Sequence, residues 1–144
     1  MSNTPNTNTT DNTARLKLYQ LNVNKSLLAH SSLLHQIKND DDIIMIQEPY
    51  ISKQGKSRAT QGWVTVYPPS HEEDPSHTRA LTLINRSIST NTWSSIPLAT
   101  QDAIAIILWT PTESLIIVNV YSDGDSIETW ELMDAMLTKF TTQR

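Results

Sequence analysis

The chain has 144 residues, no cysteine and a formal net charge of −4 at neutral pH. This length suits one domain, and the absence of thiols excludes both a disulfide framework and a thiolate metal site. The negative charge argues against a protein that binds nucleic acid through uniform positive charge, although it allows an enzyme that approaches DNA through a local patch and a metal ion.

The first third of the chain predicts a tail followed by a strand–helix–strand unit. Residues 1–14, MSNTPNTNTTDNTA, are too polar to repay the entropy of ordering, so we expect a disordered tail. A strand is expected at residues 15–23, and Ser26 can cap a helix whose apolar residues recur at helical spacing. Residues 39–42, NDDD, end this helix, and the apolar run Ile43–Gln47 predicts a strand that is buried on both faces. The two strands of such a unit are parallel.

Four further strands are predicted at residues 62–67, 79–85, 102–109 and 114–121. Only TPTE separates the last two, which requires an antiparallel hairpin, so the sheet is mixed. We expect these strands to form mainly one sheet, with an apolar sheet face that stays exposed. A final helix follows, with Asp125 as N-cap and Glu128 completing a capping box. Its apolar stripe is expected to pack on a sheet and consists of Ile127, Trp130, Met133, Leu137 and Phe140.

Polar residues at the ends of apolar strands are the candidates for a functional site. Residues 71–77, HEEDPSH, are a weaker candidate, because Pro75 breaks any helix that a zinc motif would need, and we interpret them as a solvated loop. Asn22, Glu48 and Tyr121 each end a predicted strand. Taken singly, Asn22 could satisfy a turn, Glu48 could be solvated and Tyr121 could be a core aromatic. Ligands collect at the carboxyl ends of strands in α/β sheets, where these three side chains together could hold a hard cation and a phosphate oxygen.

Four segments occur in the order found in the endonuclease/exonuclease/phosphatase superfamily: LYQLNVNKS (18–26), IIMIQEPYI (43–51), RALTLIN (79–85) and LIIVNVYSD (115–123). The chain most resembles the apurinic-type endonuclease domains of non-LTR retrotransposons. In that family the first strand ends in Asn, the second in Gln-Glu and a later one in Tyr, which match Asn22, Gln47 with Glu48, and Tyr121. The resemblance implies an α/β fold in which residues 15–144 form the N-terminal part of a truncated, DNase I-like mixed-sheet sandwich.

The resemblance also implies an activity. It suggests Mg²⁺ (or Mn²⁺) held by Glu48 with Asn22 beside it, DNA as the substrate of phosphodiester hydrolysis, and Tyr121 as a donor to a phosphate oxygen. The family's G-D-x-N strand and its S-D-H-x segment, which holds the catalytic His, have no counterpart in this sequence. YSDGD also stands where many relatives read Y-x-P-N. We therefore expect the chain alone to be inactive, and a reverse transcriptase domain downstream in a full-length member.

Two alternatives stay open at this point. The chain could belong to another phosphoesterase of the same superfamily, or it could be a catalytically incompetent remnant that acts as an interaction module. A continuation beyond Arg144 with the missing motifs would distinguish an enzyme from a remnant. The sequence shows no signal peptide and no apolar run of membrane length, so we expect a nuclear or cytoplasmic protein without a membrane partner.

Overall fold

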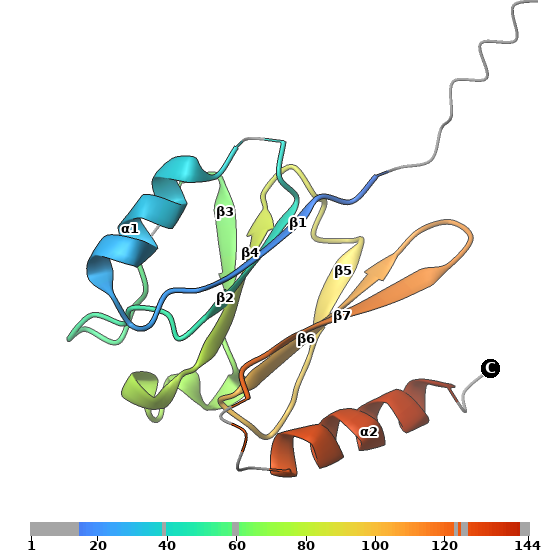
Figure 1. Cartoon of the computed structure of the whole chain (residues 1–144). Coiled ribbons are helices and arrows are strands. Elements are labelled where there is room, and N and C mark those ends of the chain that lie inside the picture. The colour runs from blue at the N-terminus through green and yellow to red at the C-terminus, as the bar shows by residue number, and fades with distance from the viewer. Residues whose placement is uncertain (1–14, 39, 59–60, 123, 125–126, 142–144) are drawn as a thin grey trace, which may run out of the picture.

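The computed structural model describes residues 15–38, 40–58, 61–122, 124 and 127–141, and its elements form two facing sheets with a helix on the outside of each (Figure 1). The expected disordered tail at residues 1–14 and the expected N-cap Asp125 lie outside the described residues. Among the described residues, no helix is long and apolar enough to cross a membrane.

The first sheet has the strand order β1-β2-β4-β3 and contains β1 (Leu18–Asn22), β2 (Ile43–Gln47), β3 (Trp63–Val66) and β4 (Ala80–Asn85). β1 pairs with β2 in parallel, as predicted, whereas β4 pairs antiparallel with both β2 and β3. The four apolar residues of β2 are buried because this strand lies inside the sheet, whereas all of β1, at the edge, is exposed. The mixed sheet expected from the sequence is therefore confirmed.

Helix α1 (Leu27–Gln36) connects β1 to β2 and covers the outer face of the first sheet (Figure 1). It begins where predicted, because the Ser26 side chain accepts a hydrogen bond of 3.1 Å from the backbone N–H of Ala29. Its buried residues are Leu33, which joins the main core, and His30, which the sequence did not single out.

The second sheet has the order β5-β6-β7 and is antiparallel throughout: β5 (Trp93–Ile96), β6 (Ala103–Trp109) and β7 (Ser114–Val120). The predicted hairpin of β6 and β7 is confirmed, but the expectation of mainly one sheet is wrong. β5, WSSI, was not predicted because two of its four residues are serines, and it is the strand that gives the hairpin a sheet of its own.

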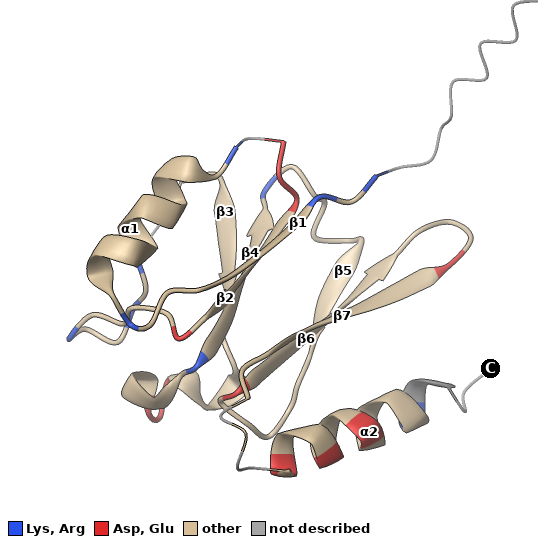
Figure 2. Cartoon of the chain, viewed as in Figure 1, with Lys and Arg blue, Asp and Glu red and all other residues tan. Residues whose placement is uncertain are grey.

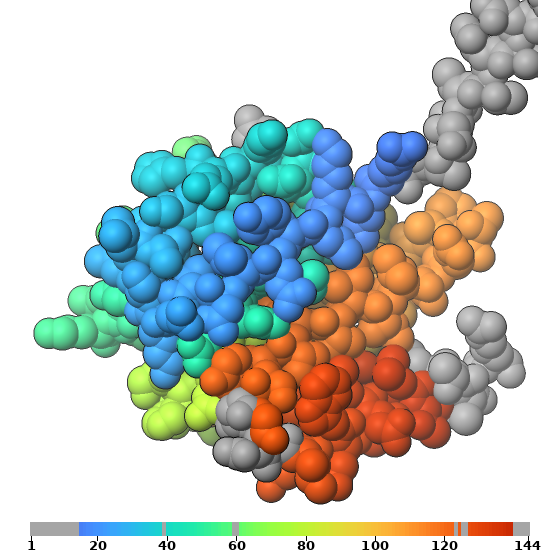
Figure 3. Space-filling model, in the orientation of Figure 1, coloured from blue at the N-terminus to red at the C-terminus, as the bar shows by residue number. Residues whose placement is uncertain are grey.

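The two sheets pack face to face, and the alternation of side chains in β6 shows how. Ile104, Ile106 and Leu108 join the core with the first sheet, whereas Ala103 and Ala105 face helix α2 (Glu128–Thr141). The apolar sheet face expected to be exposed is thus buried by the other sheet. Exposed apolar side chains are scattered over other places, including Tyr19 on β1 at 45%, Leu28 on α1 at 78%, Leu115 on β7 at 49% and Trp130 on α2 at 50%. Figure 3 shows the blue N-terminal segment running over the front surface of the molecule.

Helix α2 packs on the second sheet through a different face from the predicted one. Thr129 and Met136 are buried, whereas Ile127 is 68%, Trp130 50% and Leu137 41% exposed. The predicted stripe is therefore wrong for these three residues, and the side chain of Phe140 lies outside the described residues. The helix carries apolar residues on both sides, so periodicity alone did not decide which side faces the sheet.

The segment HEEDPSH is more ordered than a solvated loop. It forms two short 3₁₀ helices, η1 (Pro69–His71) and η2 (Pro75–His77), and His71 is only 6% exposed. The His71 ring stacks on Tyr67 at 3.9 Å, and its nitrogens contact Thr78 Oγ1 at 2.6 Å and the Gly55 carbonyl at 2.7 Å. The carbonyl can only accept, so Nε2 donates to it and Nδ1 accepts from Thr78. The interpretation as a solvated loop is confirmed for Glu72, which is exposed, but it is wrong for His71, which is buried.

Candidate active site at the ends of three strands

The carboxyl ends of β1, β2 and β7 lie at one end of the two sheets. Asn22, the last residue of β1, pairs with Gln47, the last residue of β2. The side-chain amide of Gln47 donates a hydrogen bond to the carbonyl of Val120, which ends β7. This bond crosses from one sheet to the other, so it places Tyr121, the next residue, beside the end of β2.

Glu48 follows β2 in a conformation that is unusual for a residue with a side chain. Its φ is +48°, in the left-handed region, where a non-glycine residue costs about 1–2 kcal/mol. Two hydrogen bonds hold its backbone there: its N–H donates to the Arg79 carbonyl at 2.8 Å, and its carbonyl accepts from the Lys25 N–H at 2.7 Å. Such strain persists where surrounding structure enforces it, which is common at functional sites.

The carboxylate of Glu48 is half-buried, and within the part of the chain that the structure describes no hydrogen bond or ion pair engages it. A half-buried carboxylate at a strand end is a suitable oxygen ligand for a divalent cation.

Asn22 already has a structural role. Its Oδ1 accepts a hydrogen bond of 2.9 Å from the backbone N–H of Asn24, which is the turn function proposed as its alternative. Asn24 and Lys25 both have positive φ, at 51° and 55°, so this turn is sharp. A metal ion that used the Asn22 oxygen would have to share it with the turn, whereas the Asn22 NH₂ group is left to face a ligand.

Tyr121 contacts two residues that sequence reasoning missed, Arg79 and Asp102. The backbone N–H of Tyr121 donates to the Asp102 carbonyl at 2.7 Å. The Arg79 guanidinium lies over the Tyr121 ring, 5.3 Å from its centre, and Arg79 Nε lies 3.8 Å from Asp102 Oδ1. The only signal in the sequence was a charged residue just before each of the buried strands β4 and β6.

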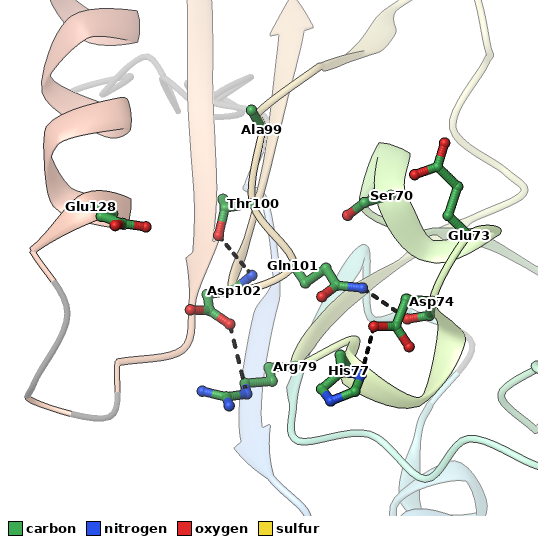
Figure 4. Close-up of a pocket in the computed structure, with 10 residues that line it drawn as sticks. All are labelled: Ser70, Glu73, Asp74, His77, Arg79, Ala99, Thr100, Gln101, Asp102 and Glu128. Carbon is green, nitrogen blue, oxygen red and sulfur yellow. Dashed lines mark hydrogen bonds and ion pairs between the residues drawn. The ribbon is translucent and has the colours of Figure 1, made fainter.

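Arg79 and Asp102 both line a cleft of about 700 Å³ (Figure 4). Four of its ten lining residues are acidic: Glu73, Asp74, Asp102 and Glu128. His77 forms an ion pair with Asp74, with His77 Nδ1 2.6 Å from Asp74 Oδ2, and this hydrogen bond lowers the pKa of Asp74. Four carboxylates against one arginine disfavour a phosphate in this cleft.

A complete metal site is not formed by the described residues. They contain no group of three or more His, Asp or Glu side chains that could hold a metal ion. The donors at the strand ends, one carboxylate from Glu48 and the amide of Asn22, are hard oxygens that fit Mg²⁺, an ion that keeps several waters and borrows substrate phosphates. The residues therefore fit part of a magnesium site.

Comparison with known proteins identifies the fold. No family model and no curated protein matches the sequence. Among solved structures, the endonuclease domain of TRAS1, a telomere-specific non-LTR retrotransposon, superposes with a TM-score of 0.67 at 18% identity, over 90% of this chain and 56% of that chain. The chain thus spans little more than half the length of that domain. Its resemblance to retrotransposon endonucleases is confirmed for the fold, and this chain forms part of a DNase I-like endonuclease fold.

Proposed function

We propose that this chain is the N-terminal part of a magnesium-dependent DNA endonuclease of retrotransposon type, which hydrolyses phosphodiester bonds. The observation that carries the proposal is the joint placement of three strand ends: the Asn22–Gln47 pair and the Gln47–Val120 bond bring the predicted residues to one end of a fold shared with an endonuclease domain. Ligands of open α/β sheets bind at such strand ends.

Each residue has a distinct part in this proposal. Mg²⁺ or Mn²⁺ bound at Glu48 supplies a Lewis acid for the phosphate. Asn22 orients the ion or the phosphate through its amide, and the Tyr121 phenol donates to a phosphate oxygen as negative charge develops. One carboxylate with neutral oxygens would bind Mg²⁺ only weakly, so substrate phosphate oxygens would have to complete its ligands.

The proposed partners follow from the same assignment. DNA is the substrate of the intact enzyme, and a reverse transcriptase domain follows in the full-length protein. The 144 residues alone are inactive under this proposal, because the sequence offers no counterpart of the family's catalytic His.

Plasmid nicking tests the proposal. The protein is assayed with supercoiled plasmid and Mg²⁺, both as residues 1–144 and with the continuation of its own reading frame. We expect nicking only by the extended protein, abolished by Glu48→Gln and unchanged by Glu113→Gln, which alters an exposed residue between β6 and β7. An extended protein that carries the missing motifs but does not nick DNA would refute the proposal. Glu48-dependent nicking by residues 1–144 would refute the inactivity of the short chain.

One observation favours the alternative of a non-catalytic interaction module. Trp130 on α2 is 50% exposed and Ile127, just before α2, is 68% exposed, and exposed large apolar side chains are a feature of interaction surfaces. The nicking assay separates the two functions, because a module would not depend on Glu48.

A further inference from the structure

Arg79 is the residue that connects Glu48 with Tyr121. Its carbonyl accepts the N–H of Glu48 at 2.8 Å, and its own N–H donates to the Gln101 carbonyl at 3.0 Å, so its backbone is fixed on both sides. Its side chain reaches in the other direction, over the ring of Tyr121. Two of the three residues in the candidate site are therefore in direct contact with this arginine.

The charges around Arg79 make its guanidinium a candidate for binding a phosphate. The chain has a net charge of −4, so affinity for a phosphate must come from a local positive group. The cleft that Asp102 lines carries several acidic side chains, and further acidic residues lie along helix α2 (Figure 2). Arg79 is part of the lining of that cleft, and its guanidinium also lies over the ring of Tyr121.

The chemistry of arginine suits a phosphate at this position. A guanidinium presents a planar set of N–H donors that matches two phosphate oxygens, and it stays charged at all physiological pH values. Asp102 Oδ1 lies 3.8 Å from Arg79 Nε, and the two side chains are 34% (Arg79) and 23% (Asp102) exposed. At that distance the pair is held by charge rather than by a short hydrogen bond. Because the Arg79 side chain is partly exposed, a phosphate can reach the guanidinium and compete with this carboxylate.

We propose that Arg79 is a phosphate-binding residue, which holds a phosphate oxygen next to the Tyr121 phenol in competition with the Asp102 carboxylate. That this phosphate belongs to DNA rests on the proposed function, whereas the anion site itself does not. The assignment adds to the site a cation that no strand-end motif revealed.

Titration with inorganic phosphate tests the anion site in the unmodified chain. Phosphate should shift the NMR signals of the Arg79 Nε–H group and of the Tyr121 amide in a saturable way. Arg79→Gln should weaken phosphate binding about tenfold or more, because it removes a charge-assisted hydrogen bond. Arg86→Gln is the matched control, since Arg86 is exposed at the opposite end of β4 and should leave binding unchanged.

Asp102→Asn provides a gain of function that a merely structural role would not produce. The backbone carbonyl that accepts the Tyr121 N–H is retained, while the competing charge is removed, so phosphate affinity should rise several-fold. Arg79→Lys keeps the charge and should bind phosphate with intermediate affinity. Equal phosphate affinity of Arg79→Gln and Arg86→Gln, or no gain with Asp102→Asn, would overturn the proposal.

Binding of a fluorescent DNA duplex at several salt concentrations tests the link to DNA. Losing one phosphate contact should reduce the slope of log affinity against log salt by about 0.9 in Arg79→Gln, but not in Arg86→Gln. Equal slopes in both variants would overturn the role of Arg79 in DNA binding. If phosphate binds at Arg79 but neither the chain nor its extended form binds DNA, the proposed function fails while the anion site stands.

Discussion

Asn119 connects the two sheets from inside the core, and its replacement tests how their packing is specified. This residue of β7 is 1% exposed, and its Nδ2 donates to the carbonyls of Leu81 at 2.9 Å and Ile46 at 3.2 Å. It therefore bridges β7 to both β4 and β2, two residues before Tyr121. Its Oδ1 has no hydrogen-bond partner in the described part of the chain.

The size of the effect follows from these contacts. Asn119→Leu removes the hydrogen bonds to the two carbonyls, each with a net contribution of about 1 kcal/mol, and a longer one of 3.4 Å to Thr82 Oγ1. It also removes the unpaired Oδ1. We expect a loss of about 1–2 kcal/mol in the free energy of unfolding, or roughly 2–8 °C in the melting temperature of a domain of this size.

Asn119→Asp should be more damaging at neutral pH. Its carboxylate would face two carbonyl oxygens with only the Thr82 hydroxyl as a nearby donor, and a buried charge without an ionic partner costs on the order of 3–5 kcal/mol. Burial raises the pKa of a carboxyl group above its usual value of about 3.9. The neutral acid is thus favoured in the folded state, and the variant should be most stable relative to wild type at low pH and lose stability as the pH rises.

Urea denaturation monitored at several pH values measures these differences. Asn91→Asp, in an exposed loop, is the matched control and should change stability by less than about 0.5 kcal/mol. If both Asn119 variants unfold within that margin of wild type at neutral pH, the amide does not hold the sheets together and the reasoning is refuted.

Three further predictions concern other parts of the chain. Glu48→Gly should be more stable than Glu48→Gln by about 0.5–1 kcal/mol in urea denaturation, because glycine tolerates the positive φ; the opposite order would show that the backbone is unstrained. Burial, followed by the charge of Arg58, lowers the pKa of His30, whose Nδ1 accepts the Tyr50 N–H. Stability should therefore fall as the pH drops below about 6.5, and His30→Asn, which keeps an acceptor, should reduce this dependence in pH-dependent melts. Trp130→Lys should lower the binding of a hydrophobic dye and the tendency to aggregate, as measured by size-exclusion chromatography, because this side chain is 50% exposed; unchanged dye binding would contradict this assignment.

Features that depend on local signals could be predicted from the sequence. The apolar run of β2 ends at Gln47, Ser26 caps α1, and four residues between β6 and β7 require a hairpin. Each of these is decided by neighbouring residues, through burial, capping or turn geometry. The parallel pairing of β1 and β2 also follows, because a connection through a helix favours no other arrangement.

Features that depend on distant pairing could not be predicted. The hairpin joins β5 rather than the first sheet, and β5 itself has only a weak strand pattern. His71 is buried because its ring finds Gly55 and Tyr67, which its own segment does not reveal. The face of α2 that packs is selected by Ala103 and Ala105, whose small side chains leave room for Met136. In each case the deciding partner lies in another part of the chain.

At Glu48 in the candidate site, one feature follows from the local sequence and another from contacts with distant segments. The Gln-Glu pair at the end of a buried strand marks Glu48 in the sequence, but its left-handed backbone is enforced by Lys25 and Arg79, which belong to other segments. Arg79 reaches Glu48 because β4 runs antiparallel to β2, so the start of one strand lies beside the end of the other. The guanidinium of the same Arg79 lies over the ring of Tyr121. The conformation of Glu48 and the position of the cation therefore have one cause, and a variant that disrupts the start of β4 should disturb both together.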